Sequence, residues 1–238
     1  MRRGKNKKSA AFVTVETIYG GGSFAVELIK HICAESSVRG REISQHISPD
    51  LARAVLGGAS YLATAKKLER FSRANYLFDL SVRAAVCALV QKEQTEGKLS
   101  VCKNFTIADI VNARMFGLEW RGNIRSIEKF SRTVWLDHDR KVEIVPDVVA
   151  FLDMGVPTAK LQIERLLDPS NSDSLLKQVD SATGEQIVDF FSRIDLSLQR
   201  RLFLEEVSKL PNYIVLDAEL SPTYNARLVL DRVEALFL

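Results

Sequence analysis

The first part of the chain alternates between short apolar runs and amphipathic stretches, and these patterns predict different elements. Residues 11–19 combine β-branched and aromatic side chains with threonine, which predicts a strand. Gly20–Gly22 end this strand, and Ser23 can cap a helix over 24–36. Helical periodicity then predicts a helix that follows Pro49 and extends through Leu68, and another over 77–94.

The middle of the chain changes element type several times over a short distance. The predicted elements are an extended segment at 99–105, a helix over 107–113 capped by Thr106, a helix over 123–131, and β-rich runs at 133–136 and 142–145 joined by a polar turn. Over residues 77–146 this order resembles the winged helix-turn-helix superfamily. The resemblance implies that helix 123–131 is a recognition helix and that the hairpin is the wing.

Beyond Pro146 the pattern is almost entirely helical. The predicted helices cover 147–154, 158–167, 173–179, 183–194, 196–210 and 222–237, with one short strand at 213–216. Their lengths vary without a fixed period, so a regular helical repeat is not expected. The complete pattern predicts a mostly α fold with small β-hairpins, in which a winged helix-like central module precedes a helical C-terminal half.

Charge divides the chain at the same place. Residues 1–145 contain 24 Lys and Arg against 15 Asp and Glu, whereas residues 146–238 contain 9 against 15, and the net charge is only +3. We therefore expect a basic disordered tail at 1–10, a basic region over 11–146 that contains the winged helix-like module, and an acidic all-α region over 147–238. Such asymmetry favours a polyanionic partner for the basic half. The alternative is a solvated tail with scattered surface lysines.

The most suggestive feature is a cationic stripe on the helix predicted over 123–131. Its members recur every three or four residues and so share one helix face: Arg121, Arg125, Lys129 and Arg132. By the resemblance, this stripe would contact DNA in the major groove, and Arg140 and Lys141 on the wing would reach a phosphate. Glu128 within the stripe weakens the attraction to a polyanion. The alternative is a solvated helix face beside a protein interface.

A second cationic patch precedes the module and consists of Lys66, Lys67, Arg70 and Arg73. In a DNA complex it would contact phosphates without reading bases. An exposed helix with charge pairing through Glu69 is the favoured interpretation of this patch.

The glycine run Gly20–Gly22 lies between a predicted strand and a predicted helix, where phosphate-binding loops are found. It lacks the Gly-Lys-Ser/Thr ending of such loops and does not fit the dinucleotide-binding fingerprint. A flexible connection is therefore the favoured interpretation.

Little in the sequence indicates catalysis. Residues Asp137-His138-Asp139 have the composition of a metal cluster, but neighbouring side chains on a tight turn diverge. Asp217 and Glu219 form a carboxylate pair without an identifiable partner. No Ser/His/Asp or Cys/His arrangement can be assembled from the sequence. We expect a protein that is not an enzyme and that needs no cofactor or metal.

Cysteine usage and hydropathy bear on location. Cys33, Cys87 and Cys102 are too widely spaced for a disulfide framework or a zinc site and are expected to be buried in a reducing compartment. No apolar run is long enough to span a membrane, and the basic N-terminus lacks a signal-peptide core. A cytoplasmic location is expected, or a nuclear one in a eukaryote.

Together these features favour a non-catalytic protein that binds double-stranded DNA through helix 123–131 and the hairpin. The alternative is an accessory subunit that uses its acidic helices to bind a larger ATPase or nuclease, in DNA repair, chromosome organisation or anti-phage defence. The irregular helices of 146–238 and the apolar C-terminal end favour this alternative.

Overall fold

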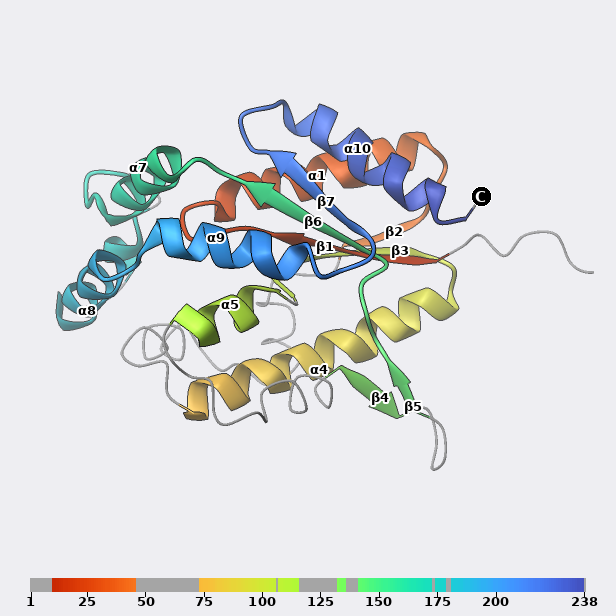
Figure 1. Cartoon of the computed structure of the whole chain (residues 1–238), viewed down its shortest axis with the longest axis horizontal. Coiled ribbons are helices and arrows are strands. Elements are labelled where there is room, and N and C mark those ends of the chain that lie inside the picture. Colours follow the sequence, from red (N-terminus) through yellow and green to blue (C-terminus); the bar gives the residue numbers. More distant parts are fainter. Residues whose placement is uncertain are drawn as a thin grey trace, which may run out of the picture.

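The computed structural model describes residues 10–45, 73–105, 107–115, 132–135, 141–172, 174–178 and 181–237. In these residues the chain forms a five-stranded parallel sheet with helices on both faces, and a separate two-stranded hairpin (Figure 1). The predicted mostly α fold is therefore wrong, because the protein has a mixed α/β fold.

The sheet has β1 in its centre. Its strands are β1 (Ala11–Glu16), β2 (Ile43–Gln45), β3 (Leu99–Lys103), β6 (Val148–Asp153) and β7 (Tyr213–Asp217), in the order β2-β3-β1-β6-β7. Every neighbouring pair is parallel. Val15 of β1 lies opposite Lys103 of β3 and Ala150 of β6, so the carboxyl ends of these three strands lie together.

The largest departure from the prediction is β6, where a helix was expected over 147–154. Its residues Val148–Leu152 are all buried. A central strand of a parallel sheet is covered on both faces, so its sequence is a continuous apolar run without alternation. Periodicity cannot separate such a run from a short buried helix. The neighbouring strand β7 confirms the short strand predicted at 213–216.

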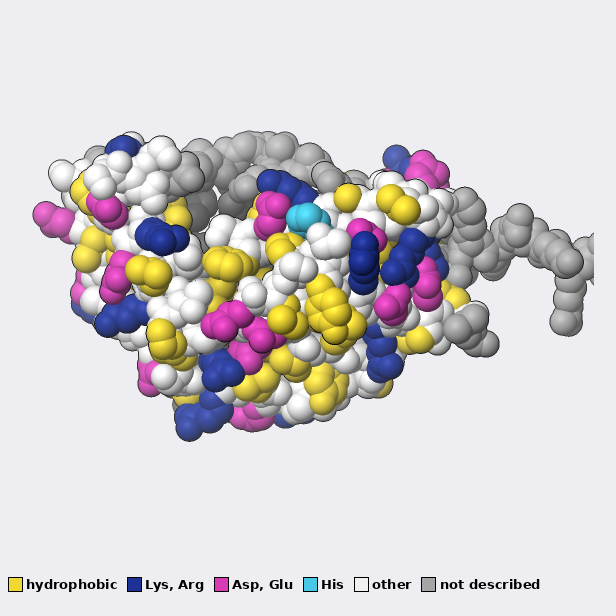
Figure 2. All heavy atoms as spheres, turned by 90° about the horizontal axis from the view of Figure 1, so that it is seen from above, with side chains coloured by type: hydrophobic (Ala, Val, Ile, Leu, Met, Phe, Trp, Pro, Cys, Tyr) yellow, Lys and Arg dark blue, Asp and Glu magenta, His cyan; other side chains and the backbone are white. Residues whose placement is uncertain are grey.

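Two layers of helices cover the sheet. Helices α1 (Gly22–Val38) and α10 (Pro222–Ala235) pack against each other on one face, and α4 (Arg73–Thr95), α5 (Ile107–Met115) and α9 (Leu196–Val207) lie on the other (Figure 1). Arg39–Asp231 and Arg227–Glu35 ion pairs, at 2.9 and 3.2 Å, join α1 to α10. On the outer face of this helix pair, charges of both signs are interspersed with hydrophobic side chains (Figure 2).

The segment between β6 and β7 adds further helices at the carboxyl end of the sheet (Figure 1). It contains α7 (Val156–Leu167), the short 3-10 helix η1 (Leu175–Gln178) and α8 (Ser181–Ser192), followed by α9. Helices α7, α8, α9 and α10 confirm the helices predicted over 158–167, 183–194, 196–210 and 222–237, with small shifts at their ends. In the described part of the helix predicted over 173–179, residues Leu175–Gln178 form the 3-10 helix η1.

The hairpin predicted around residues 133–145 is confirmed. Strands β4 (Thr133–Trp135) and β5 (Lys141–Glu143) are antiparallel, with Val134 opposite Val142. The helix-strand-helix order before it is present as α4, β3 and α5, but β3 pairs with β1 and β2 inside the main sheet. The helices predicted after Pro49 and over 123–131 lie outside the described residues, so the winged helix resemblance stays a prediction.

The core confirms the prediction for the cysteines, because Cys33, Cys87 and Cys102 are free and buried. Cys87 and Cys102 belong to a cluster between α4 and the sheet in which Phe12 and Phe105 meet edge to face at 5.0 Å. Burial raises the pKa of Cys87 to about 12, so this thiol remains protonated at neutral pH.

Candidate functional site at the carboxyl end of the sheet

The chain leaves β1 and β3 toward opposite faces of the sheet, although the two strands are neighbours. After β1 it continues into α1 on one face, whereas after β3 it continues into α5 on the other (Figure 1). In open parallel sheets, ligands bind outside the carboxyl ends of strands at such a divergence. The residues at this position are the loop 17–22, which joins β1 to α1, and Lys103 at the end of β3.

Two glycines of the loop are required by its shape. Gly20 has a φ of +87°, which disfavours any other residue, and a Cβ there would overlap the carbonyl oxygen of Ala159 in α7. A Cβ on Gly21 would collide with Oγ1 of Thr17. The loop is therefore folded tightly against its neighbours, whereas its interpretation as a flexible connection stays a prediction.

Gly22 differs from these two glycines, because a Cβ there would not clash with any described atom. Among the described atoms, only Nζ of Lys103 would lie within 4 Å of that Cβ, at 3.8 Å. The backbone conformation of Gly22 does not explain the glycine either, since its φ is not positive. A side chain at Gly22 would therefore extend into the space beside Nζ of Lys103 at the start of α1.

Hydrogen bonds from three parts of the fold hold the loop. The N–H of Thr17 donates to Oδ1 of Asn104 at 3.0 Å, and Oγ1 of Thr17 donates to the carbonyl of Leu152 at 3.4 Å. The N–H of Tyr19 donates to Oε1 of Gln199 in α9 at 3.0 Å. These partners come from the ends of β3 and β6 and from α9, so the loop conformation depends on the complete sheet.

The ring of Tyr19 also fixes the loop, because it packs against α8. It meets Phe190 and Phe191 edge to face, with ring centroids 5.7 and 5.9 Å apart. The helical segment between β6 and β7 is thereby attached to the loop through aromatic contacts as well as through the approach of Gly20 to α7.

The N-terminus of α1 faces this site without a cap from a side chain. The N-cap is Gly21, no side chain of the described residues accepts a hydrogen bond there, and the first turn contains no acidic residue. Ser23 is exposed inside the first turn, so its predicted capping role is wrong. By contrast, Asp195 caps α9 and Ser221 caps α10. The first N–H groups of α1 and the positive end of its dipole are therefore directed at the site.

Two carboxylates close to the site are occupied by the fold. Glu16, at the end of β1, is fully buried and accepts the N–H groups of Phe105 and Ala108 at 3.0 and 3.2 Å, which caps the start of α5. Asp153, at the end of β6, accepts two hydrogen bonds from Arg200 at 2.6 and 2.7 Å. This contact raises the pKa of Arg200. Both negative charges are compensated where they stand.

Most residues of the predicted DNA surface lie outside the described residues: Arg121, Arg125, Lys129, Arg140, Lys66, Lys67 and Arg70. Arg73 begins α4. Arg132 forms an ion pair with Glu143 of the hairpin at 3.1 Å, and Lys141 is exposed on β5. Among the predicted DNA contacts, Arg132 of the stripe is thus held in an ion pair within the protein, and Lys141 of the wing lies on the surface of the hairpin.

The carboxylates considered for catalysis do not form a metal centre within the described part of the chain, where no group of three His, Cys, Asp or Glu side chains could hold an ion. Asp217 shapes a turn, because its Oδ1 accepts the N–H of Glu219 at 2.8 Å. Asp137, His138 and Asp139 lie outside the described residues.

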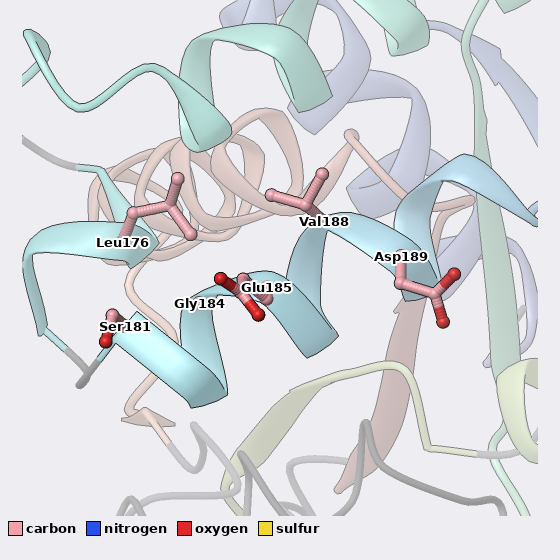
Figure 3. A pocket seen from close by; sticks show the side chains of 6 residues that line it. All are labelled: Leu176, Ser181, Gly184, Glu185, Val188 and Asp189. Atoms are coloured by element: carbon pink, nitrogen blue, oxygen red, sulfur yellow. The ribbon is translucent and has the colours of Figure 1, made fainter.

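A separate open pocket of about 480 Å³ lies between η1 and α8. Its lining residues are Leu176, Ser181, Gly184, Glu185, Val188 and Asp189 (Figure 3). It has no residue in common with the loop 17–22, although Phe190 and Phe191 of the same helix contact Tyr19.

The sequence pattern indicates the glycine run, but no local signal indicates Lys103, Asn104, Gln199 or the capping role of Glu16. None of the described helices is long and apolar enough to cross a membrane. No protein-family model and no curated protein matches this chain.

Proposed function

We propose that this protein binds the phosphate group of a nucleotide at the start of α1. The observation that supports the proposal is the loop Gly20–Gly22, packed tightly between β1 and α1, with Nζ of Lys103 beside its last glycine. A glycine-rich turn between a parallel strand and a helix is a recurrent way to bring backbone N–H groups to a phosphate.

The electrostatics of the loop support an anionic ligand. The uncapped start of α1 supplies N–H donors and a partial positive charge, and Nζ of Lys103 lies beside Gly22. The nearby carboxylates of Glu16 and Asp153 are engaged by N–H groups and by Arg200. Each hydrogen bond from the loop to a charged phosphate oxygen would contribute about 1.5–3 kcal/mol.

This proposal takes precedence over DNA binding because it is supported by residues whose positions are described. The DNA-binding hypothesis rests on a helix outside those residues, and Arg132, which is described, is engaged by Glu143. DNA binding and attachment to a larger ATPase or nuclease remain predictions from the sequence.

The test is calorimetric titration of the full chain with common ribonucleosides, their mono-, di- and triphosphates, and pyrophosphate. We expect binding that requires the phosphate. Gly22→Val should abolish it, because the new side chain would fill the open approach to the backbone. Ala34→Val, which places the same valine side chain at an exposed position of α1, is the control and should bind normally.

Two results would overturn the proposal. The first is that the wild-type chain binds no phosphate compound in the panel. The second is that a folded Gly22→Val variant, verified by circular dichroism, binds with unchanged affinity.

A further inference from the structure

We infer that the outer edge of β7 pairs with β7 of a second copy of this chain, so that two sheets join into one across a twofold axis. β7 is the outer strand beside β6 and follows it without a break over five residues (Figure 1). The strand at the opposite edge, β2, has only three residues. Natural sheets commonly protect an exposed edge with a lysine, a proline or a bulge, and β7 contains none of these.

The hydrogen bonds to β6 determine which backbone groups of β7 point outward. The N–H of Ala218, just after β7, donates to the carbonyl of Asp153 in β6 at 2.9 Å, and the carbonyl of Asn212, just before β7, accepts an N–H of β6 at 3.0 Å. Successive residues of a strand direct these groups to opposite edges, so the even-numbered residues of β7 bond to β6. Tyr213 and Val215 therefore direct their N–H and C=O groups outward. In the described part of the chain no other hydrogen bond uses these four groups.

The same two residues also have exposed side chains. Val215 lies opposite Phe151 of β6, whose ring stacks on Phe203 of α9 with centroids 5.2 Å apart, so the odd-numbered residues of β7 are on the α9 face of the sheet. α9 covers β6 there and leaves β7 open, because Tyr213 and Val215 are 39% and 43% exposed, whereas Leu216 on the other face is buried. Aromatic and β-branched side chains in this position favour the addition of a further strand.

A second copy fits this edge because the edge is complementary to itself. In an antiparallel pairing centred on Ile214, Tyr213 lies opposite Val215 of the second copy, and the twofold axis repeats this pair. Each pair exchanges two hydrogen bonds, so four bonds use all the outward groups of both copies. The tyrosine ring also lies beside the valine side chain, which is a favourable cross-strand contact.

Charge favours the antiparallel arrangement over a parallel one. Asp217 is the one charged residue of β7 and stands at its end. In the antiparallel pairing it lies opposite Pro211 of the second copy and is separated from the other Asp217 by six residues, or about 20 Å, along the strand. A parallel pairing in register would place the two carboxylates side by side, which destabilises a sheet. The pairing ends at Asp217, because its carbonyl already accepts the N–H of Leu220 and Nδ2 of Asn225 at 3.2 and 2.8 Å.

The first experiment measures the mass of the full chain by analytical ultracentrifugation over a wide range of concentrations. We expect a dimer whose fraction rises with concentration. Val215→Lys should raise the dimer dissociation constant by at least about tenfold, because it removes both cross-strand pairs and places a lysine at the edge. Val188→Lys is the matched control, since Val188 of α8 is also 43% exposed, and this variant should dimerise like the wild type.

The second experiment tests the register with single cysteine variants under oxidising conditions. Ile214 faces Ile214 of the second copy as a pair without hydrogen bonds, in which the Cα atoms lie about 4.5 Å apart, within the range of a disulfide. Ile214→Cys should therefore form a disulfide-linked dimer, whereas Val215→Cys should not, because its partner is Tyr213. The three native cysteines are buried and should not compete.

Three results would overturn the inference. The first is a wild-type chain that stays monomeric at every concentration. The second is a Val215→Lys variant that is folded by circular dichroism and dimerises like the wild type; if this variant does not fold, Tyr213→Lys replaces it in the same comparison. The third is a disulfide-linked dimer of Val215→Cys but not of Ile214→Cys. The outer edge of β7 has no residue in common with the loop 17–22, so these results are independent of nucleotide binding.

Discussion

Gln199 offers a direct test of whether the fold positions the loop. This side chain is 2% exposed, and its Oε1 accepts the N–H of Tyr19 at 3.0 Å, while its Nε2 donates to Oδ1 of Asn112 at 3.4 Å. Gln199→Leu keeps the approximate size of the side chain but removes both bonds. The first bond matters more, because its loss leaves the N–H of Tyr19 without its acceptor next to Gly20.

The magnitude follows from that N–H. Leaving a fully buried donor unsatisfied costs about 1–3 kcal/mol, which is an upper limit here because the bond from Tyr19 to Gln199 is only part-buried. We therefore expect the free energy of unfolding to fall by about 1 kcal/mol, with little added by the longer bond to Asn112. If the loop shifts so that the N–H of Tyr19 donates to water, the phosphate site is distorted. A loss of about 1.4 kcal/mol in binding free energy would then correspond to tenfold weaker affinity.

Asp195→Ala provides a control of similar cost in the same helix. Asp195 caps α9 by accepting the N–H of Leu198 at 2.9 Å, and its loss should destabilise the protein by about 0.5–2 kcal/mol. Denaturant unfolding and calorimetric titration of both variants separate stability from positioning. We expect Gln199→Leu to weaken nucleotide binding and Asp195→Ala to leave it unchanged. Equal affinities for the two variants would refute the positioning role of Gln199.

Three further predictions concern other parts of the molecule. Gly20→Ala should lower the free energy of unfolding by at least about 1–2 kcal/mol, because Gly20 has a left-handed backbone conformation. An unchanged midpoint in denaturant unfolding would disprove this. The hydrogen bond from Arg114, with a smaller effect of the one from Lys209, lowers the pKa of Glu205 to about 2. The stabilisation by these contacts is therefore complete above the usual pKa of a glutamate and should be lost as the pH falls from about 5 toward 2. Arg114→Met should flatten that part of the stability profile, and an unchanged profile would contradict the assignment. For the DNA-binding hypothesis, reversing the charges of Arg125 and Lys129 should weaken duplex DNA binding and reduce its salt dependence; unchanged titrations would reject that site.

Local patterns were sufficient for parts of the fold. The strand at 11–19, the hairpin and the long C-terminal helices have clear alternation, turn residues or amphipathic faces, and the structure contains them. The strand Val148–Asp153 was missed because a strand buried on both faces lacks alternation. This error contributed to the wrong fold class, since β6 joins β7 to β1 in the sheet, and the edge strand Ile43–Gln45 was not predicted either.

The candidate site could not be predicted for a different reason, because its members are distant in the sequence. Gly22 and Lys103 approach each other only because β1 and β3 are parallel neighbours, and Gln199 reaches Tyr19 only because α9 packs beneath the loop. A glycine run without a following lysine therefore looks like a connection when it is considered alone. Once the sheet order is known, the same three glycines have distinct roles. Gly20 and Gly21 allow the tight approach of α7 and Thr17, and Gly22 leaves the start of α1 open beside a lysine from another strand. The assignment of function to this chain thus depends on topology, and the variants of Gly22 and Gln199 test it at two different positions of the loop.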